Sequence, residues 1–437
     1  MNRGKLIRSL FYIAMILMAG VCCRHPSNQW ILHSTPVEAG MNGDTLALID
    51  TLLTAMADEG KIAGAVALVA RDGKIVYNRA FGYSDIEAGQ PMTTEHLFRI
   101  ASMTKPVVSV AIMQLYEAGM LRLTDPVSLY IPSFESPSVL LSHDPSEQSW
   151  LTRPASREIT IHHLLTHTSG IGYGFNSQWL RQLYSAAGIP DMATTGDISL
   201  EDKMSVLGTL PLLHDPGVRF TYGLSTDVLG RVVEVVSGMT LGQYIHKNIT
   251  SPLKMEETRF FYPKEMGNRF ANLYSYDSRR QQVVPYSSNR SEAYDFATEG
   301  AKRYFSGGSG LSSTITDYYI FCQAILNGGE YRGTRILSEE SVDMMTGNRL
   351  RGRQGREFGY GFGIERGEDP HNPGDSVVTH LGWAGAFGTW FTINPSSNVI
   401  AIVMTQVVFN PWERELTRGF RNAVNASTEV TPPLPSP

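Results

Sequence analysis

Alternating apolar positions predict two β-hairpins that lie near opposite ends of the chain. In the first, two apolar runs flank Arg71-Asp72-Gly73-Lys74, a sequence typical of a hairpin turn. In the second, similar runs flank Asn394-Pro-Ser-Ser-Asn398. The expected strands are 64–70, 75–83, 388–393 and 399–405. Hairpins at both ends predict one antiparallel sheet assembled from distant parts of the chain.

Between the two hairpins the apolar residues recur with helical spacing. An earlier helix is expected from the Asn42-Gly-Asp44 sequence, which is suited to cap its start, to about Glu59. The further expected helices are 105–118, 161–166, 226–236 and 314–326. The pattern as a whole predicts an α+β fold, in which a mostly helical region is inserted between strands of an antiparallel sheet flanked by helices.

The first 23 residues differ in kind from the rest of the chain. Basic residues precede the uncharged apolar run 10–21, which is too short to span a bilayer and has the length of a signal-peptide core. Cys22 and Cys23 follow directly, and this order resembles a bacterial lipoprotein signal, in which a cysteine becomes the lipidated N-terminus. An ordinary secretory signal is the alternative. We therefore expect an exported bacterial protein, periplasmic or held at a membrane as a lipoprotein.

Composition indicates how the remaining chain is divided and which classes of function are excluded. Residues 24–40 are polar and irregular and are expected to be a linker, 41–425 one folded domain, and 426–437 a tail rich in proline. The 437 residues include 37 basic and 42 acidic side chains, and a net charge of −5 argues against broad nucleic-acid binding. Three cysteines are too few for a disulfide framework or a cysteine-based zinc site, and Cys322 is expected to be a small core residue.

Ser102 and Lys105 form the first candidate for chemistry. At this spacing on a first helical turn, the two side chains project from one face. A serine hydroxyl becomes an effective nucleophile when a neighbouring base takes its proton, and a lysine surrounded by apolar residues can serve as that base. The alternative is a helix start with a capping serine and a solvated lysine, because Ser-x-x-Lys alone also occurs by chance.

Two further segments carry candidate residues. Tyr222 lies in a loop before an expected helix, where a phenol can relay a proton between nucleophile and leaving group, or simply pack with its hydroxyl at the surface. The segment 380–395 places small residues at the start of an expected strand. A backbone N–H there could join that of Ser102 to hold an oxyanion, or the glycines could mark an edge strand without a ligand.

Together these segments resemble the serine β-lactamase and penicillin-binding-protein superfamily, in its class C-like branch. The order is Ser-x-x-Lys, then a tyrosine, then a glycine-containing strand. The neighbouring strings that carry the resemblance are 98–106 (FRIASMTKP), 159–170 (ITIHHLLTHTSG), 237–244 (SGMTLGQY), 252–255 (PLKM) and 307–317 (GGSGLSSTITD). The resemblance covers about residues 38–410, and it implies the β-lactamase/transpeptidase-like fold.

The resemblance also implies roles. Ser102 would be the acylated nucleophile, Lys105 its proton acceptor and Tyr222 the partner base. The backbone N–H groups of Ser102 and Ala386 would hold the oxyanion. Such enzymes work through an acyl-enzyme with neither a metal nor an organic cofactor. His162, His163 and His167, which could otherwise suggest a metal site, would be structural residues at a helix end.

The chain departs from class C β-lactamases at two positions. Leu224 stands where the second motif has asparagine, and Trp383-Ala-Gly385 stands where the third motif has Lys-Thr-Gly. A tryptophan cannot supply the charge that binds a substrate carboxylate, and both changes make the cleft more apolar. These variants are similar to family VIII carboxylesterases and related acyltransferases. Ester hydrolysis, on small acyl esters or lactones, is therefore the expected activity.

Other interpretations of these motifs and of the activity stay open. In a second register His380-Leu-Gly382 resembles the third motif of D-amino-acid peptidases, although His380 is expected just outside the site, and Tyr360 either lines the cleft or packs. A β-lactamase or DD-peptidase acting on peptidoglycan-like amides is one alternative activity, and a sensor acylated without turnover is another. The expected partner is a small molecule, chosen by loops such as 136–155 and 262–300. We expect a monomer that contacts a membrane only through a lipid anchor.

Overall fold

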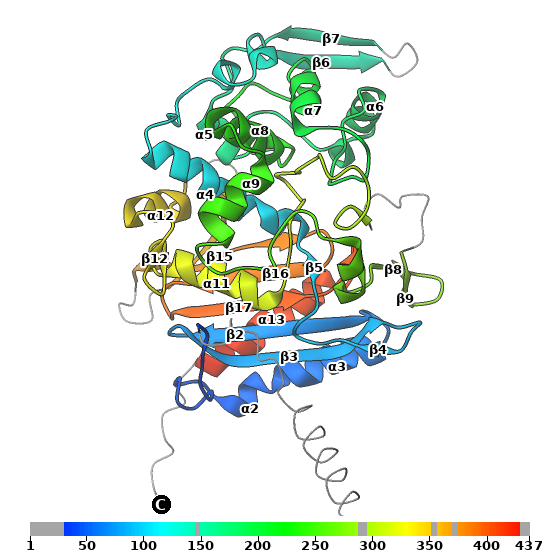
Figure 1. The fold of residues 1–437 in the computed structure, drawn as a ribbon, viewed down its shortest axis with the longest axis vertical. Coiled ribbons are helices and arrows are strands. Elements are labelled where there is room, and N and C mark those ends of the chain that lie inside the picture. The colour runs from blue at the N-terminus through cyan, green and yellow to red at the C-terminus, as the bar shows by residue number, and fades with distance from the viewer. Residues whose placement is uncertain (1–29, 145–148, 287–294, 351–355, 369–373, 429–437) are drawn as a thin grey trace, which may run out of the picture.

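The computed structural model describes residues 30–144, 149–286, 295–350, 356–368 and 374–428. The expected signal peptide, with Cys22 and Cys23, and the end of the expected tail lie outside these residues. Figure 1 shows a large sheet in the lower half of the molecule and a helical lobe above it. The segments of the sheet come from both ends of the chain, shown in blue and in orange to red, as the hairpin pattern predicts.

The sheet follows the order β1-β3-β2-β17-β16-β15-β14-β13, with the short strand β4 beside β3. Every pairing along this order is antiparallel except β1 with β3. The strands are β1 (Leu32–His33), β2 (Gly64–Arg71), β3 (Lys74–Asp85), β4 (Gln90–Pro91), β13 (Glu357–Phe358), β14 (Gly363–Glu368), β15 (Ser376–Gly385), β16 (Thr389–Asn394) and β17 (Val399–Met404). Both predicted hairpins are confirmed, and they meet where β17 pairs with β2.

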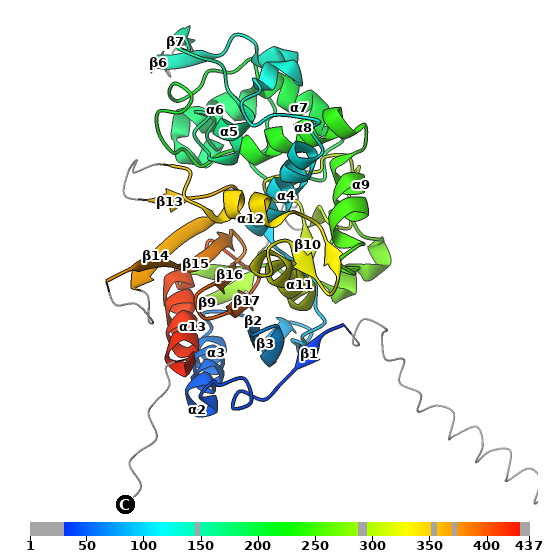
Figure 2. The ribbon, with the colours of Figure 1, turned by 90° about the vertical axis from the view of Figure 1, so that its left-hand side faces the viewer.

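Both faces of the central strands are buried, which explains why β2 reads as a continuous apolar run. Ala65, Ala67 and Val69 of β2 pack towards α3 (Leu48–Asp58) and α13 (Glu413–Thr428). The intervening Val66 and Leu68 belong to the larger core, which includes α4 (Thr104–Glu117) and α11 (Ile315–Leu326). Figure 2 shows α3 and α13 side by side on one face of the sheet and α11 on the other.

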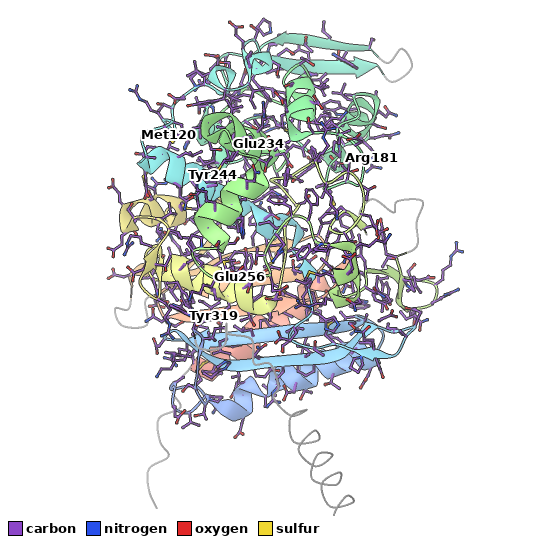
Figure 3. The ribbon with its side chains drawn as sticks, in the orientation of Figure 1. Met120, Arg181, Glu234, Tyr244, Glu256 and Tyr319 are labelled. Atoms are coloured by element: carbon purple, nitrogen blue, oxygen red, sulfur yellow. The ribbon has the colours of Figure 1, made fainter. Side chains whose placement is uncertain are left out.

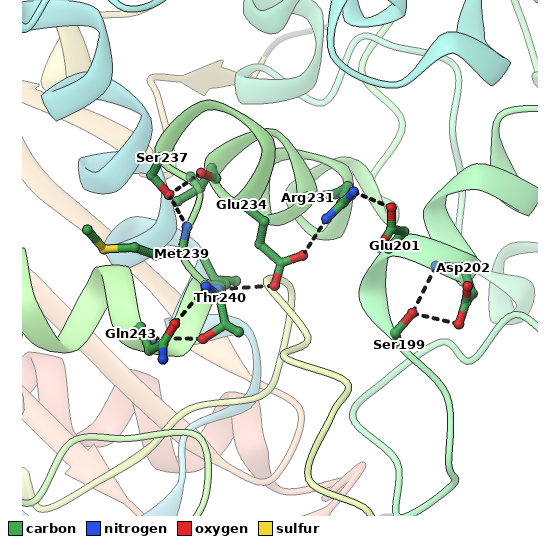
Figure 4. A network of polar contacts seen from close by, with 11 residues as sticks. Ser199, Glu201, Asp202, Arg231, Glu234, Ser237, Met239, Thr240 and Gln243 are labelled. Carbon is green, nitrogen blue, oxygen red and sulfur yellow. Dashed lines mark hydrogen bonds and ion pairs between the residues drawn. The ribbon is translucent and has the colours of Figure 1, made fainter.

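The helical lobe is inserted between the two sets of strands (Figure 1). It contains α5 (Ile161–Leu165), α6 (Gln178–Ala186), α7 (Leu200–Leu207), α8 (Ser225–Ser237) and α9 (Leu241–Ile245), and the hairpin of β6 (Ser138–Asp144) and β7 (Ser149–Pro154). The polar contacts in Figure 4 join three of its helices. The Arg231 guanidinium contacts Glu201 at 2.6 Å and Glu234 at 3.2 Å, and Glu234 accepts a hydrogen bond from the Leu241 N–H at 3.1 Å.

Helix α11 packs on the sheet and also contacts the first hairpin. Figure 3 labels Tyr319 on α11, whose hydroxyl donates a 3.0 Å hydrogen bond to the Gly73 carbonyl oxygen in the first hairpin turn. The remaining strands and α-helix of the described residues are β5 (Phe98–Arg99), β8 (Tyr274–Asp277), β9 (Gln282–Pro285), β10 (Ser312–Ser313), β11 (Glu330–Tyr331), β12 (Thr334–Arg335), α12 (Glu339–Thr346) and β18 (Val407–Val408). Within the described ranges, no helix has the length and apolar character needed to cross a membrane.

Three predicted boundaries change. The helix expected to run to about Glu59 is interrupted at Ala47, so that α2 (Gly43–Leu46) is followed by the separate α3. The expected linker 24–40 contributes β1, which pairs with the start of β3, because Leu32 and His33 find free backbone groups at that sheet edge. Helix α13 extends to Thr428, into the expected tail, where buried Ser427 accepts the Asn42 N–H at its carbonyl oxygen at 2.8 Å.

Candidate active site

Ser102 lies on a short 3₁₀ turn, Ala101–Met103, between β5 and α4. The preceding residue Ala101 has a φ of +42°, a left-handed conformation that costs energy for a residue with a Cβ atom. Ser102 is partly exposed on this turn, whereas Ala101 and Met103 on either side of it are buried. The first N–H groups of a helical segment have no acceptor within it, so the Ser102 backbone is suited to bind a negative charge.

Lys105 is buried directly beside this serine. Its side chain is only 1% exposed, and its Nζ donates hydrogen bonds to Ser102 Oγ at 3.1 Å, Tyr173 Oη at 2.9 Å and the Gly308 carbonyl oxygen at 2.8 Å. Three acceptors fix the three N–H directions of the ammonium group. The alternative of a solvated lysine is therefore excluded, and the Lys105 nitrogen lies where, as a neutral amine, it can take the Ser102 proton.

Tyr222 completes the group of candidate residues. The Lys105 Nζ lies 4.6 Å from the centroid of the Tyr222 ring. The Tyr222 hydroxyl accepts a 3.0 Å hydrogen bond from Trp383 Nε1, so the candidate residues of the second and third segments contact each other. Because the indole N–H can only donate, the hydrogen of the Tyr222 hydroxyl is left to point elsewhere.

The histidine-rich string positions the Tyr222 loop. His167 has a φ of +51°, its carbonyl oxygen accepts the Thr221 N–H at 2.7 Å, and its ring centroid lies 4.9 Å from that of Tyr222. His163 forms a capping box with Thr160 at the start of α5. Burial lowers the pKa of His163 to about 4, so its ring is neutral at neutral pH. Within the described residues, no three metal-ligating side chains come together.

Ala386 follows the end of β15, beside the nucleophile. Its backbone N–H has no acceptor within the described part of the chain. A Cβ atom added at the preceding Gly385 would collide with the Ile100 carbonyl oxygen and with the Thr389 hydroxyl. The glycine therefore lets β15 approach the turn that carries Ser102 as closely as it does, and both Ser102 and Ala386 line one cavity.

A cavity of about 370 Å³ opens above these groups. Ser102, Tyr222, Trp383, Gly385 and Ala386 line it, as the sequence predicts. Much of the remaining lining is aromatic or apolar, and it comes from segments that sequence analysis did not single out: Tyr173, Phe175, Met192 and Phe409. A concave, mostly apolar pocket around a nucleophile is the form that small-molecule sites take.

Tyr173 and a buried polar cluster behind Lys105 also belong to the site, although neither was predicted from the sequence. Asp227 on α8 is 1% exposed, and its Oδ1 accepts a 2.7 Å hydrogen bond from Ser306 Oγ. Burial raises the pKa of Asp227, whereas the Ser306 hydroxyl, the Lys105 charge and the Gly308 backbone lower it. The Gly308 peptide group therefore lies between Lys105 and Asp227. Tyr173 follows the HHLLTHTSG string by three residues, and that nearness was the available signal.

Comparison with known proteins identifies the family. A model of the family described as "Beta-lactamase" matches residues 49–426. The chain belongs to this β-lactamase family. Esterase EstB of Burkholderia gladioli is 33% identical over 404 residues, which cover 87% of this chain and 95% of EstB. As a member of this family with an esterase relative, the protein is a serine hydrolase.

Solved structures agree with the family assignment. The structure of EstCE1, a hydrolase with promiscuous acyltransferase activity, has a TM-score of 0.73 and 27% identity, and the match covers 87% of this chain and 98% of EstCE1. Simvastatin synthase LovD from Aspergillus terreus, unliganded, has a TM-score of 0.73 and 25% identity, covering 88% of this chain and 99% of LovD. The predicted β-lactamase/transpeptidase-like fold is confirmed.

Not every residue predicted for the site of this β-lactamase-family protein lines the cavity. Leu224 is fully buried in the core at the start of α8, so its predicted contact with substrate is wrong. Tyr360 is 4% exposed and its hydroxyl contacts His162 Nδ1 at 2.9 Å, so it packs. His380 lies outside the catalytic cavity, in a neighbouring hollow of about 420 Å³ that shares Trp383. Cys322 is a fully buried core residue, as predicted.

Proposed function

We propose that the protein is a carboxylesterase that hydrolyses small acyl esters or lactones through an acyl-enzyme on Ser102. The observation that carries the proposal is the 3.1 Å hydrogen bond from the buried Lys105 Nζ to Ser102 Oγ, at the base of an apolar cavity. The similarity to EstB, whose name describes an esterase, supports the same activity.

In the proposed reaction, Ser102 Oγ attacks the ester carbonyl carbon while its proton passes to the neutral amine of Lys105, which becomes an ammonium group. The carbonyl oxygen becomes an oxyanion, which the backbone N–H groups of Ser102 and Ala386 stabilise. The alcohol departs with a proton relayed through Lys105 and Tyr222, and the acyl group stays on Ser102. Water then attacks the acyl-serine with the same groups acting in reverse, and the acid leaves.

The lining of the cavity favours esters over β-lactams and D-peptides. Trp383 stands at the position expected for a lysine, and its indole N–H is already used by Tyr222. Among the described residues that line the cavity, none carries a positive charge for a substrate carboxylate. Amide substrates also require more effective protonation of the leaving group than esters do. A β-lactamase or peptidase is therefore the second candidate.

The proposal extends to location and assembly. The basic and apolar N-terminal pattern followed by Cys22 and Cys23 supports export, with one of these cysteines carrying a lipid that holds the enzyme at a membrane. The expected active form is a monomer. Radiolabelled palmitate incorporated by the full-length chain, and lost in Cys22→Ser or Cys23→Ser, would identify the lipidated residue.

The test of the activity is a parallel assay of p-nitrophenyl butyrate and a chromogenic cephalosporin, with Ser102→Ala protein as the blank. Turnover of the ester that depends on Ser102, with little turnover of the cephalosporin, is the expected result. Efficient cephalosporin turnover would favour the β-lactamase reading. Acylation of Ser102 without turnover of either compound would favour a narrow peptidase or a sensor.

A further inference from the structure

The catalytic cavity has an uneven distribution of charge. Asp191 and Glu413 are the two charged residues among the described residues that line it, and both are acidic. The nearby basic residue, Lys105, is 1% exposed and donates its hydrogen bonds to Ser102, Tyr173 and Gly308. A substrate group in the cavity therefore meets carboxylates and no exposed positive charge from these residues.

The two carboxylates differ in what they bind. Asp191 Oδ1 accepts a 2.5 Å hydrogen bond from the Gly174 N–H, and this contact fixes the turn that carries Tyr173 and Phe175. Glu413 is the first residue of α13, and its carboxylate has no hydrogen-bond or ion-pair partner in the described part of the chain. Burial is the one cause that raises the pKa of Glu413. Glu413 is therefore the carboxylate left to interact with a ligand.

Exposed aromatic rings accompany this carboxylate. Phe175 and Phe409 line the cavity and remain 46% and 67% exposed, which places them at its mouth. Phe409 has a φ of +47°, an outlier for a bulky residue, and strain of this kind concentrates at functional sites. Its N–H donates to the Ala386 carbonyl oxygen at 3.3 Å, so the strained residue is tied to the oxyanion segment.

Aromatic faces beside a carboxylate are the chemistry that recognises a quaternary ammonium group, because the ring faces and the carboxylate all attract a cation without requiring a hydrogen bond. We propose that the cavity selects esters that carry an alkylammonium group, which Glu413, Phe175 and Phe409 hold while Ser102 attacks the ester. This inference rests on the proposed esterase function. The products are the free acid and the ammonium alcohol, since Ser102 releases the alcohol and water later releases the acyl group.

The test compares butyrylcholine with 3,3-dimethylbutyl butyrate, its neutral carbon isostere. We expect kcat/KM for butyrylcholine to exceed that for the isostere by at least about tenfold. Glu413→Gln is expected to lower this ratio by at least about threefold. Glu415→Gln is the matched control on the same helix, because Glu415 pairs with Lys61 at 3.0 Å and does not line the cavity. The ratio is expected to be unchanged in the control.

A wild-type ratio of one or below overturns the inference, and so does a Glu413→Gln ratio equal to that of the control. Turnover of the neutral ester would still support the esterase function in either case. If neither ester is turned over, calorimetric titration of both into Ser102→Ala protein decides. Tighter binding of butyrylcholine that weakens with an added Glu413→Gln change supports the inference, and equal affinities overturn it.

Discussion

The indole Nε1 of Trp383 donates a 3.0 Å hydrogen bond to the hydroxyl oxygen of Tyr222. This bond joins the last part of β15 to the loop before α8, and the Tyr222 ring in turn lies over Lys105. Compared with a lysine at this position, Trp383 removes a positive charge from the cavity, and it also contacts Tyr222. Its N–H also holds the Tyr222 hydroxyl in the cavity that Ser102 lines.

Trp383→Phe keeps an aromatic ring in the cavity but removes the N–H donor. We expect kcat for p-nitrophenyl butyrate to fall about tenfold or more, with a smaller change in KM, because a misplaced proton-transfer group affects the transition state more than binding. Trp390→Phe on the neighbouring strand is the control, since Trp390 packs against Phe420 and does not line the catalytic cavity. Equal kcat values for the two variants would contradict this role.

Tyr173→Phe removes one of the three acceptors of the Lys105 ammonium group. We expect kcat to fall by about 10- to 100-fold, because the lysine loses a contact that directs it at Ser102. The control is Tyr184→Phe, which removes a buried hydroxyl bonded to the Gly172 carbonyl oxygen at 3.3 Å, away from Lys105. A shift in the pH profile of kcat/KM in Tyr173→Phe alone would separate positioning of the lysine from a general loss of packing. Matching pH profiles in Tyr173→Phe and Tyr184→Phe would refute the role of Tyr173 in positioning the lysine.

Gly385→Ala tests the close approach of β15 to the nucleophile turn. The added Cβ must displace the Ile100 carbonyl oxygen, and with it the spacing between the Ser102 and Ala386 N–H groups. We expect a loss of at least about 100-fold in kcat, the scale seen when an oxyanion donor is removed. Gly267→Ala is the control, because nothing lies near its added Cβ. Activity close to wild type in Gly385→Ala would contradict the oxyanion assignment.

The buried carboxyl group of Asp317 is expected to make the stability of the fold depend on pH. Burial raises its pKa from 3.8 to about 7, against hydrogen bonds from the Glu257 N–H and the Thr258 hydroxyl that lower it. The folded state therefore keeps a proton that the unfolded chain releases near pH 4, so this group's contribution to stability is largest at low pH and is lost as the pH rises to about 7.

Asp317→Asn removes this titration. The unfolding free energy of the variant minus that of wild type is expected to increase by about 2–3 kcal/mol from about pH 5 to about pH 8. Urea unfolding at both pH values measures the difference. Asp343→Asn, at an exposed position of α12, is the control and is expected to show no such change. A constant difference between Asp317→Asn and wild type would show that Asp317 titrates normally.

The parts of the fold that were predictable are those in which local pattern and burial agree. The hairpin turn at Arg71–Lys74 and the helical spacing after Lys105 depend on neighbouring residues alone, and both are present. The Ser102–Lys105 pair was predictable because adjacent helical turns bring such residues together. The pairing of β1 with β3 was not, since it depends on a free sheet edge built by residues far along the chain.

The wrong and missing predictions about the site also depend on tertiary structure. Leu224 directly follows the Tyr222-Gly pair, but the start of α8 turns its side chain into the core. Glu413 and Phe409 reach the cavity from the far end of the chain, and nothing in their local sequence connects them to Ser102. Tertiary structure brings such residues together, and a single sequence does not record it.

The central claim is that Ser102 carries the acyl group. The most direct measurement is mass spectrometry of the purified protein after rapid quenching with p-nitrophenyl butyrate, followed by mapping of the modified peptide. We predict one butyryl group on the peptide that contains Ser102, and neither label nor turnover in Ser102→Ala. A butyryl group on another residue, or continued turnover by the Ser102→Ala protein, would contradict the account.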